Sequence, residues 1–472
     1  MYRNFIPVAV RALCLLLLLA LVACAPSRPG LERLTFAPLE FHPPEVEIIE
    51  LPSGVRLYLK EDHELPLVEI SALVGAGSIS VPADETGMAG IFAALLRTGG
   101  AGERGPEELE EALERLAADL SVATETYTTG VDLSLRTEDL APGLAILADL
   151  LRRPGFDPRR LEIARQQAIE AVRRQNDLPD SIADRALMQA IYGDHPLGRY
   201  PTVESLQQVE RDDLIAFHQH YFHPNNLWLA VSGDFQRGEL LRLLDEAFAG
   251  WAPAEVARQE IPPLQEVGPA AVRVADKAIP QATILVGELG IDKDHPDLHA
   301  VRVMNYILGG GGFNSRLMRE IRSNRGLAYS VYSTYQVGRR LPGPFVAGTE
   351  TKTSSTLEAV GLLRQIMEEM RTTAVTEQEL TLARESLVNS FVFAFTDTHS
   401  VVTQQMRLDW FDYPPDYLVT FRDKVAAVTA DDVLRVARRH LNPERQNIVL
   451  VGDRKQMGDL SVLDLPVETI EP

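Results

Sequence analysis

The chain has 472 residues, of which 45% are hydrophobic and 24% charged, a composition typical of a folded protein with two or three domains. Its formal net charge of −21 disfavours a nucleic acid as partner. Both cysteines lie within the first 24 residues, which excludes disulfides and cysteine-ligated metals from the rest of the chain.

The first segment is typical of an exported lipoprotein. Arg3 and Arg11 precede an apolar run that is too short for a stable membrane span. The run ends at Cys24, preceded by small residues, which resembles a bacterial lipobox. We expect residues 1–23 to be a signal peptide, Cys24 to be lipidated and residues 24–44 to form a proline-rich tether. The expected location is the periplasmic side of the cell envelope, anchored by lipid in the outer membrane.

Strands and helices follow without strict alternation. Strands at 46–51 and 55–60 flank a Pro-Ser-Gly turn, and residues 67–74 form a third. The next predicted elements are a helix beginning at Pro106, with Leu109, Leu113, Leu116 and Leu120 on one face, strands at 121–124 and 130–136, and a helix from Pro158 to Arg174. This mixture predicts an α+β fold.

One internal repeat is visible. Arg211 begins a helix-like segment, followed by a proline break and a strand-like run that closes at Asp234. Ala430 begins the same succession 219 residues later, and that copy closes at Asp453. A period of this length corresponds to a whole domain. We therefore predict two homologous lobes, each a mainly antiparallel sheet packed with helices.

The predicted boundaries place the first lobe at residues 45–255 and the second at 270–465. Residues 256–269 form the linker, because the surrounding stretch bears prolines and shows no sustained apolar periodicity. Residues 466–472 are a short tail.

Three stretches resemble the insulinase/pitrilysin metallopeptidases, of the mitochondrial-processing-peptidase-like type. Residues 195–199 resemble a loop of the family's first domain, and residues 87–100 occupy the place of its zinc-binding helix. Residues 309–317 and 325–331 resemble the signature of its second domain. In the smaller bacterial members of this family, one two-lobed chain carries zinc and a second supplies substrate-binding residues.

The zinc ligands of the family are missing. The family helix reads His-x-x-Glu-His, with a third ligand on a distant helix, and its glutamate acts as general base. Here Gly90 and Ala94 stand at the histidine positions and Ala93 at the base. The third ligand falls near Glu170 or Ala171, and one carboxylate does not hold zinc. The resemblance therefore implies a degenerate zinc site, with no metal or other cofactor on this chain and no catalytic residue of its own.

Arg322 and Tyr329 are the candidate substrate-binding residues. The family binds substrate near the scissile bond through an arginine and a tyrosine seven residues later, and these two residues have that spacing. The resemblance implies that both bind the peptide and stabilise developing oxyanion charge. Arg325 is a second candidate, but it lies only four residues before the tyrosine. Without the resemblance, a surface arginine and a tyrosine on a strand face are the simpler interpretation.

The glycine run at residues 309–312 is interpreted as a flexible wall beside the substrate or a hinge, with helix termination as the simpler alternative. Two histidine groups are weaker candidates for a metal. His218, His220 and His223 are interpreted as a solvated helix end. His295 and His299 are four apart, but no glutamate occupies a base position between them.

The sequence thus favours the zinc-free subunit of a heterodimeric metallopeptidase, inactive alone. Its expected partners are a zinc-carrying insulinase-type chain, a peptide that pairs with a sheet edge, and the membrane through the lipid anchor. The alternative is a catalytically silent scaffold or assembly protein of the bacterial envelope. An autonomous zinc peptidase is disfavoured.

Overall fold

The computed structural model describes residues 44–256 and 261–471. The expected signal peptide and the expected lipidation site, Cys24, lie outside these residues. Within them, none of the helices combines the length and the apolar character needed to cross a membrane.

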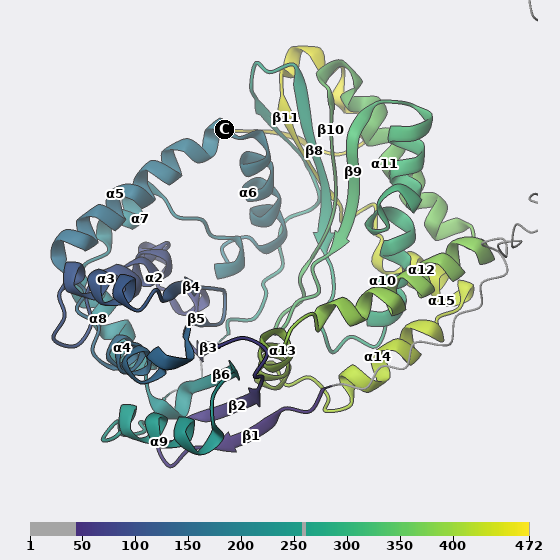
Figure 1. Cartoon of the computed structure of the whole chain (residues 1–472). Coiled ribbons are helices and arrows are strands. Elements are labelled where there is room, and N and C mark those ends of the chain that lie inside the picture. The colour runs from purple at the N-terminus through teal and green to yellow at the C-terminus, as the bar shows by residue number, and fades with distance from the viewer. Residues whose placement is uncertain (1–43, 257–260, 472) are drawn as a thin grey trace, which may run out of the picture. The chain divides into compact units, whose positions relative to one another are not determined.

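Six strands form the first sheet, in the order β1-β2-β6-β3-β5-β4 (Figure 1). Neighbouring strands are antiparallel except β2 and β6, which are parallel. Gly54, at a φ of 92°, makes the tight turn between the first two strands. The strands are β1 (Glu47–Glu50), β2 (Arg56–Glu61), β3 (Leu67–Val74), β4 (Asp119–Thr124), β5 (Thr129–Arg136) and β6 (Leu227–Gly233).

The second sheet repeats this order as β12-β7-β11-β8-β10-β9, with β12 in the place of β1. β7 pairs in parallel with both β11 and β12, and the other pairs are antiparallel. Both sheets are therefore mixed. The strands are β7 (Val272–Asp276), β8 (Gln281–Leu289), β9 (Ala328–Tyr335), β10 (Pro344–Lys352), β11 (Asn447–Gly452) and β12 (Val467–Ile470).

Helices bury one face of each sheet, and alternate strand residues point into the two resulting cores. The first core contains side chains from α2 (Met88–Thr98), α3 (Pro106–Arg115), α4 (Leu140–Arg152), α5 (Pro158–Arg174), α7 (Val203–Gln208), α8 (Arg211–Tyr221) and α9 (Arg237–Ala247). The second contains side chains from α10 (Leu298–Asn305), α11 (Thr356–Thr372), α12 (Glu377–Ser390), α14 (Tyr417–Ala426) and α15 (Ala430–His440).

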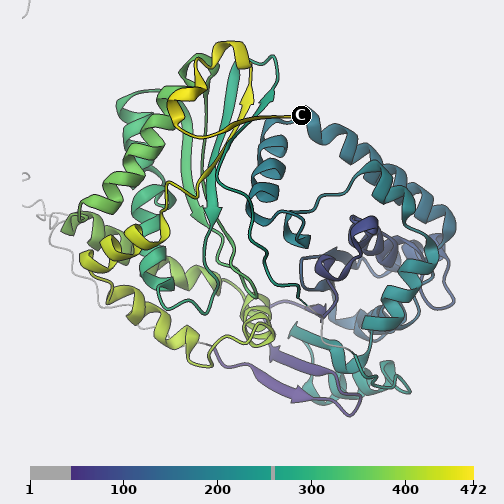
Figure 2. The ribbon, with the colours of Figure 1, turned by 180° about the vertical axis from the view of Figure 1, so that it is seen from behind.

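The other face of each sheet receives a helix from the opposite half of the chain (Figure 2). α6 (Pro179–Tyr192) packs on β8 and β11, where Leu187 joins a cluster with Leu285. α13 (Thr398–Trp410) packs on β2 and β6 through Met406. α6 and α13 begin 219 positions apart, so they occupy equivalent positions in the two repeats. We call this reciprocal packing the helix exchange. Each half thus completes the packing of the other.

The predicted α+β class with two related lobes is confirmed. One local prediction is wrong: the helix that begins at Pro106 ends at Arg115, and Leu120 belongs to β4. Ala117 adopts a φ of 47°, which ends the helical path although the spacing of leucines continues. The side chain of Leu120 is buried from the strand instead.

Candidate functional site

α2 is the helix on which the resemblance places the zinc ligands. Ile91 and Phe92 are buried on it, whereas Gly90 is exposed in the first turn. A Cβ atom built at Gly90 would meet nothing within 4 Å. Ala93 is buried and Ala94 half-buried. These three positions offer no side-chain nitrogen or oxygen that could bind a metal or accept a proton.

α5 packs against α2 and carries the position of the third ligand. Ala171 lines the same cavity as Gly90, together with Ala168. Glu170 instead accepts a hydrogen bond from Nη1 of Arg173 at 2.5 Å, and its side chain is 49% exposed. The side chain that α5 presents toward α2 at this level is therefore a methyl group.

The cavity at this degenerate site has a volume of about 440 Å³. Its lining contains one charged side chain, Arg199, and no histidine, aspartate or glutamate. Zinc sites need at least three anionic or imidazole ligands, and a guanidinium repels a divalent cation. The residues present do not fit zinc. Apolar and small side chains dominate the lining: Val81, Gly87, Ala89, Gly90, Ile91, Ala168, Ala171, Val172, Pro196, Pro201 and Leu206.

Arg322 and Tyr329 meet at the surface of the second half. Arg322 lies on a π-helical segment, Met318–Asn324, and Tyr329 is the second residue of β9. Nη1 of Arg322 donates a hydrogen bond to the backbone oxygen of Tyr329 at 2.7 Å, and its Cζ lies 4.4 Å from the ring centroid. The tyrosine is 83% exposed. π-Helical turns often accompany functional sites, and this one carries the candidate arginine. Neither residue lines the cavity at α2.

An irregularity in the β9–β10 pairing explains why the carbonyl of Tyr329 is available. The register shifts between Thr349 and Thr351, and the facing β9 residues are Tyr329 and Ser330. The backbone oxygen of Ser330 accepts from the hydroxyl of Thr349 at 2.8 Å. A bulge re-aims backbone groups away from the ladder. The oxygen of Tyr329 therefore meets Arg322.

Phe313 also contacts the arginine, and sequence analysis did not single it out. Its ring centroid lies 4.7 Å from Cζ of Arg322, and its side chain is 67% exposed. It follows the glycine run, in which Gly309 packs so closely that a Cβ atom would lie 2.3 Å from the backbone nitrogen of Ser333. Gly309 therefore permits a close approach to β9, which does not suit a hinge. In the sequence, the one signal for Phe313 is an aromatic residue directly after a glycine run.

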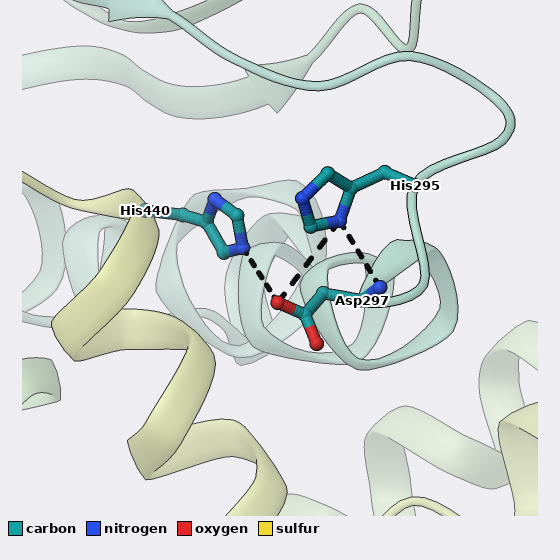
Figure 3. Close-up of side chains that lie close together, drawn as sticks. All are labelled: His295, Asp297 and His440. Atoms are coloured by element: carbon teal, nitrogen blue, oxygen red, sulfur yellow. Dashed lines mark hydrogen bonds and ion pairs between the residues drawn. The ribbon is translucent and has the colours of Figure 1, made fainter.

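Figure 3 shows a second cluster, His295, Asp297 and His440, whose potential metal-binding atoms lie within 4.8 Å of one another. Nε2 of His440 is 2.9 Å from Oδ2 of Asp297, and Nδ1 of His295 is 4.0 Å away. However, Arg435 contacts Oδ1 at 2.6 Å and Arg439 contacts Oδ2 at 3.3 Å. A metal ion would have to displace both guanidinium groups. We interpret Asp297 as an ion-pair hub that ties the start of α10 to α15.

The electrostatics of the hub agree with this interpretation. Burial alone would raise the pKa of Asp297, but hydrogen bonds from His440 and Arg435 outweigh burial and lower it. Burial lowers the pKa of His440 despite the nearby carboxylate. The charge of the carboxylate is therefore matched mainly by arginine.

The other histidine group is also structural. His218 is buried and its Nε2 lies 2.9 Å from the backbone oxygen of Leu151, so the predicted solvated helix end is wrong for this residue. Burial lowers the pKa of His218 to about 4. Nε2 of His223 lies 2.8 Å from the backbone oxygen of Gln219, within its own helix end. His220 is exposed. In His218 and His223, Nε2 is therefore engaged by a backbone oxygen.

Comparison with known protein families gives two matches. Residues 56–202 match the model described as insulinase, peptidase family M16, and residues 208–387 match the model described as peptidase M16 inactive domain. Together they span most of both halves, including α2, Arg322 and Tyr329.

One relative is named as a non-peptidase homologue and others as zinc proteases. A Helicobacter pylori protein named non-peptidase homolog YmxG is 28% identical over 407 residues, covering 85% of this chain and 93% of its own. A Mycobacterium leprae protein named an uncharacterized zinc protease is 25% identical over 366 residues, covering 74% and 79%. The crystal structure of a peptidase M16 inactive domain from Pseudomonas fluorescens superposes with a TM-score of 0.77 at 25% identity, covering 86% and 98%. One name denies peptidase activity and another states a zinc protease, so the side chains at the site of this chain must decide.

Proposed function

Because this chain belongs to peptidase family M16 as an inactive member, we propose that it is the zinc-free subunit of a two-chain peptidase. Its role is to bind the peptide beside the metal site of a zinc-carrying M16 partner and to stabilise the transition state there. The observation that carries the proposal is the pair Arg322 and Tyr329, held together at the surface while the zinc face of α2 has only hydrogen and methyl groups.

The two side chains suit a peptide in chemistry and in exposure. A guanidinium adds positive charge and directed donors, and a phenol adds one more donor. Such groups stabilise negative charge that develops on a carbonyl oxygen during hydrolysis. The partner's zinc would supply the activated water and polarise the same carbonyl. Arg325 is a poor substitute, because it already contacts Glu320 at 3.0 Å.

β4 lies at one edge of the first sheet and β9 at one edge of the second, with β1 and β12 at the opposite edges. The edge of β9 is covered near Ser333, whose backbone oxygen accepts a hydrogen bond from Asn305, so a peptide would pair with the exposed part around Tyr329. An extended peptide can add to such an edge through main-chain hydrogen bonds. β9 carries Tyr329, so a peptide there would pass directly beside the pair. This arrangement favours unfolded segments or peptides over folded proteins as ligands.

The envelope location belongs to the same proposal. Lipidation at Cys24 and a tether would place the folded body at a membrane surface, facing the periplasm, where the zinc-carrying partner is also expected. Labelling with a lipid precursor and substitution Cys24→Ala would test the anchor. Loss of membrane association in that variant is the expected result, and unchanged association would contradict the anchor.

The experiment that tests the peptidase role is reconstitution. The full-length chain is mixed with a zinc-carrying M16 chain from the same envelope, and hydrolysis of a quenched fluorescent peptide is measured. We expect Arg322→Ala to lower kcat/KM of the mixture by about a hundredfold, the scale of losing one transition-state donor. Arg319→Ala is the matched control, since Arg319 is on the same segment and contacts Glu379 at 3.6 Å.

Equal activity of wild type and Arg322→Ala in the mixture would defeat the proposed role. Absence of turnover with any zinc-carrying M16 chain of that envelope would instead favour the scaffold. Both outcomes are measured in the same assay.

A further inference from the structure

Arg322 differs from the neighbouring arginines in having no carboxylate partner. The three neighbours each contact a glutamate: Arg316 with Glu379 at 2.8 Å, Arg319 with Glu379 at 3.6 Å and Arg325 with Glu320 at 3.0 Å. Across residues 44–256 and 261–471, no ion pair involves Arg322. An unpaired cation in a chain of net charge −21 is available to an external anion.

The donors of Arg322 are divided between the protein and solvent. Nη1 donates to the backbone oxygen of Tyr329, whereas Nη2 and Nε have no acceptor among the described residues. These two nitrogens form one side of the planar fork. Two parallel N–H groups match the two oxygens of a carboxylate and gain charge assistance. A single peptide carbonyl would use only one of them.

Two aromatic rings hold the guanidinium in place. The ring centroids of Phe313 and Tyr329 lie 4.7 and 4.4 Å from Cζ of Arg322. Both side chains are mostly exposed, at 67% and 83%, so neither is required by the core. A ring beside a guanidinium restricts its motion and lowers the entropy lost when a ligand binds. The remaining approach is along the edge formed by Nη2 and Nε.

Resting on the proposed function, we propose that Phe313, Arg322 and Tyr329 form a carboxylate-binding site for peptides. Arg322 binds the carboxylate edge-on, and Phe313 is a positioning residue that fixes the plane of the guanidinium. The carboxylate belongs either to the C-terminus of the peptide or to an aspartate or glutamate side chain. No bond is made or broken in this step.

The test measures binding by the full chain alone, without the zinc-carrying subunit. Three labelled peptides share one extended sequence: a free C-terminal acid, its C-terminal amide, and the amide with one glutamine changed to glutamate. Fluorescence anisotropy gives Kd for each. We expect the peptides with a carboxylate to bind about tenfold more tightly than the neutral amide, as one bidentate charged contact would give. The free acid and the glutamate peptide distinguish the two sources.

Variants assign the effect to the three residues. Arg322→Ala and Arg322→Lys should both abolish the preference, because lysine keeps the charge but lacks the fork. Arg319→Ala removes an equal charge from the same segment and should leave the preference for carboxylate peptides unchanged. Phe313→Ala should reduce the preference about threefold, the scale of an exposed cation–π contact, and Phe313→Tyr should restore it. Circular dichroism and urea midpoints confirm that each variant is folded.

Equal binding of acid, amide and glutamate peptides to the wild type would overturn the site. The site would also be overturned if Arg319→Ala lost as much of the carboxylate preference as Arg322→Ala. If binding ignores the carboxylate but the reconstituted peptidase still needs Arg322, this inference fails and the proposed function stands. If the carboxylate preference is found but no mixture cleaves peptides, the binding site stands and the peptidase role fails.

Discussion

His399 and Ser71 lie 328 positions apart in the chain, yet Nε2 of the histidine is 2.9 Å from the hydroxyl oxygen of the serine. His399 is on α13 and Ser71 on β3, so this hydrogen bond joins the two halves of the molecule. Ser232 of β6 contacts the other ring nitrogen at 2.8 Å. Partly buried hydrogen bonds therefore hold α13 on the sheet of the other half, in addition to apolar packing.

Substitution His399→Ala should destabilise the chain by about 1–2 kcal/mol, because it removes the histidine partner of the buried Ser232 hydroxyl, whereas the hydroxyl of Ser71 keeps its hydrogen bond to Asp132. Urea unfolding followed by circular dichroism measures the change. A single transition is expected, since each half packs on a helix of the other. His220→Ala, at an exposed histidine, is the control. An equal effect of the two substitutions would contradict the fastening role of His399.

Acid should weaken the fold through His218. Burial lowers the pKa of His218 in the folded chain to about 4, whereas the unfolded chain has the ordinary value of 6.5. The unfolded state therefore binds more protons between these values, so stability is present above pH 6.5 and is lost as the pH falls toward 4. His218→Gln should remove about 2 kcal/mol of the stability difference between pH 7 and pH 5. Urea midpoints of both proteins at the two pH values measure this, and parallel pH profiles would refute it.

The ion-pair hub at Asp297 predicts that a substitution of Asp297 lowers the stability of the fold and that added zinc does not change it. Asp297 is 4% exposed and contacts Arg435, Arg439 and His440. Because the arginines are half exposed, Asp297→Asn should cost about 1–3 kcal/mol, less than breaking a fully buried pair. Zinc and a chelator should each leave the Tm of the wild type unchanged. A rise in Tm with zinc that disappears in Asp297→Asn would show a metal site instead.

The degenerate zinc site should be restorable. The triple variant Gly90→His, Ala94→His and Ala171→Glu supplies the three ligands that the helix positions imply. Gly90 has open space for a Cβ atom, so the first change meets no steric obstacle. We expect close to one zinc per chain by elemental analysis after dialysis. The double variant Gly90→His and Ala94→His keeps Ala171 and the native Glu170. After dialysis it should retain at least tenfold less zinc per chain than the triple variant. Equal zinc contents would refute the assignment of Ala171 as the third position.

Much of the fold could be predicted because the sequence carries it locally. The Pro-Ser-Gly turn and the cap at Asp157 are short-range patterns, and the 219-residue repeat is a direct likeness between two stretches of sequence; the structure follows all three. The leucine spacing through Leu120 misled, because a strand residue can continue a helical period by coincidence. Ala117 in a left-handed conformation ends the helix, and alanine gives no sign of this in sequence.

The remaining features depend on contacts between distant residues. The exchange of α6 and α13 could not be predicted, because no pattern near His399 indicates Ser71 as its neighbour. The hub at Asp297 was missed since His440 lies 143 positions away. The spacing of Arg322 and Tyr329 was informative only through the family resemblance. Phe313 gained meaning when the structure placed its ring beside the guanidinium.

The most direct test of the central claim is peptide hydrolysis by the isolated full-length chain, assayed with added zinc and again with a chelator. We predict no hydrolysis above buffer in either condition, because the residues around Gly90 and Ala171 offer zinc no ligand set. Hydrolysis that co-elutes with the chain, stops with the chelator and returns with zinc would contradict the account.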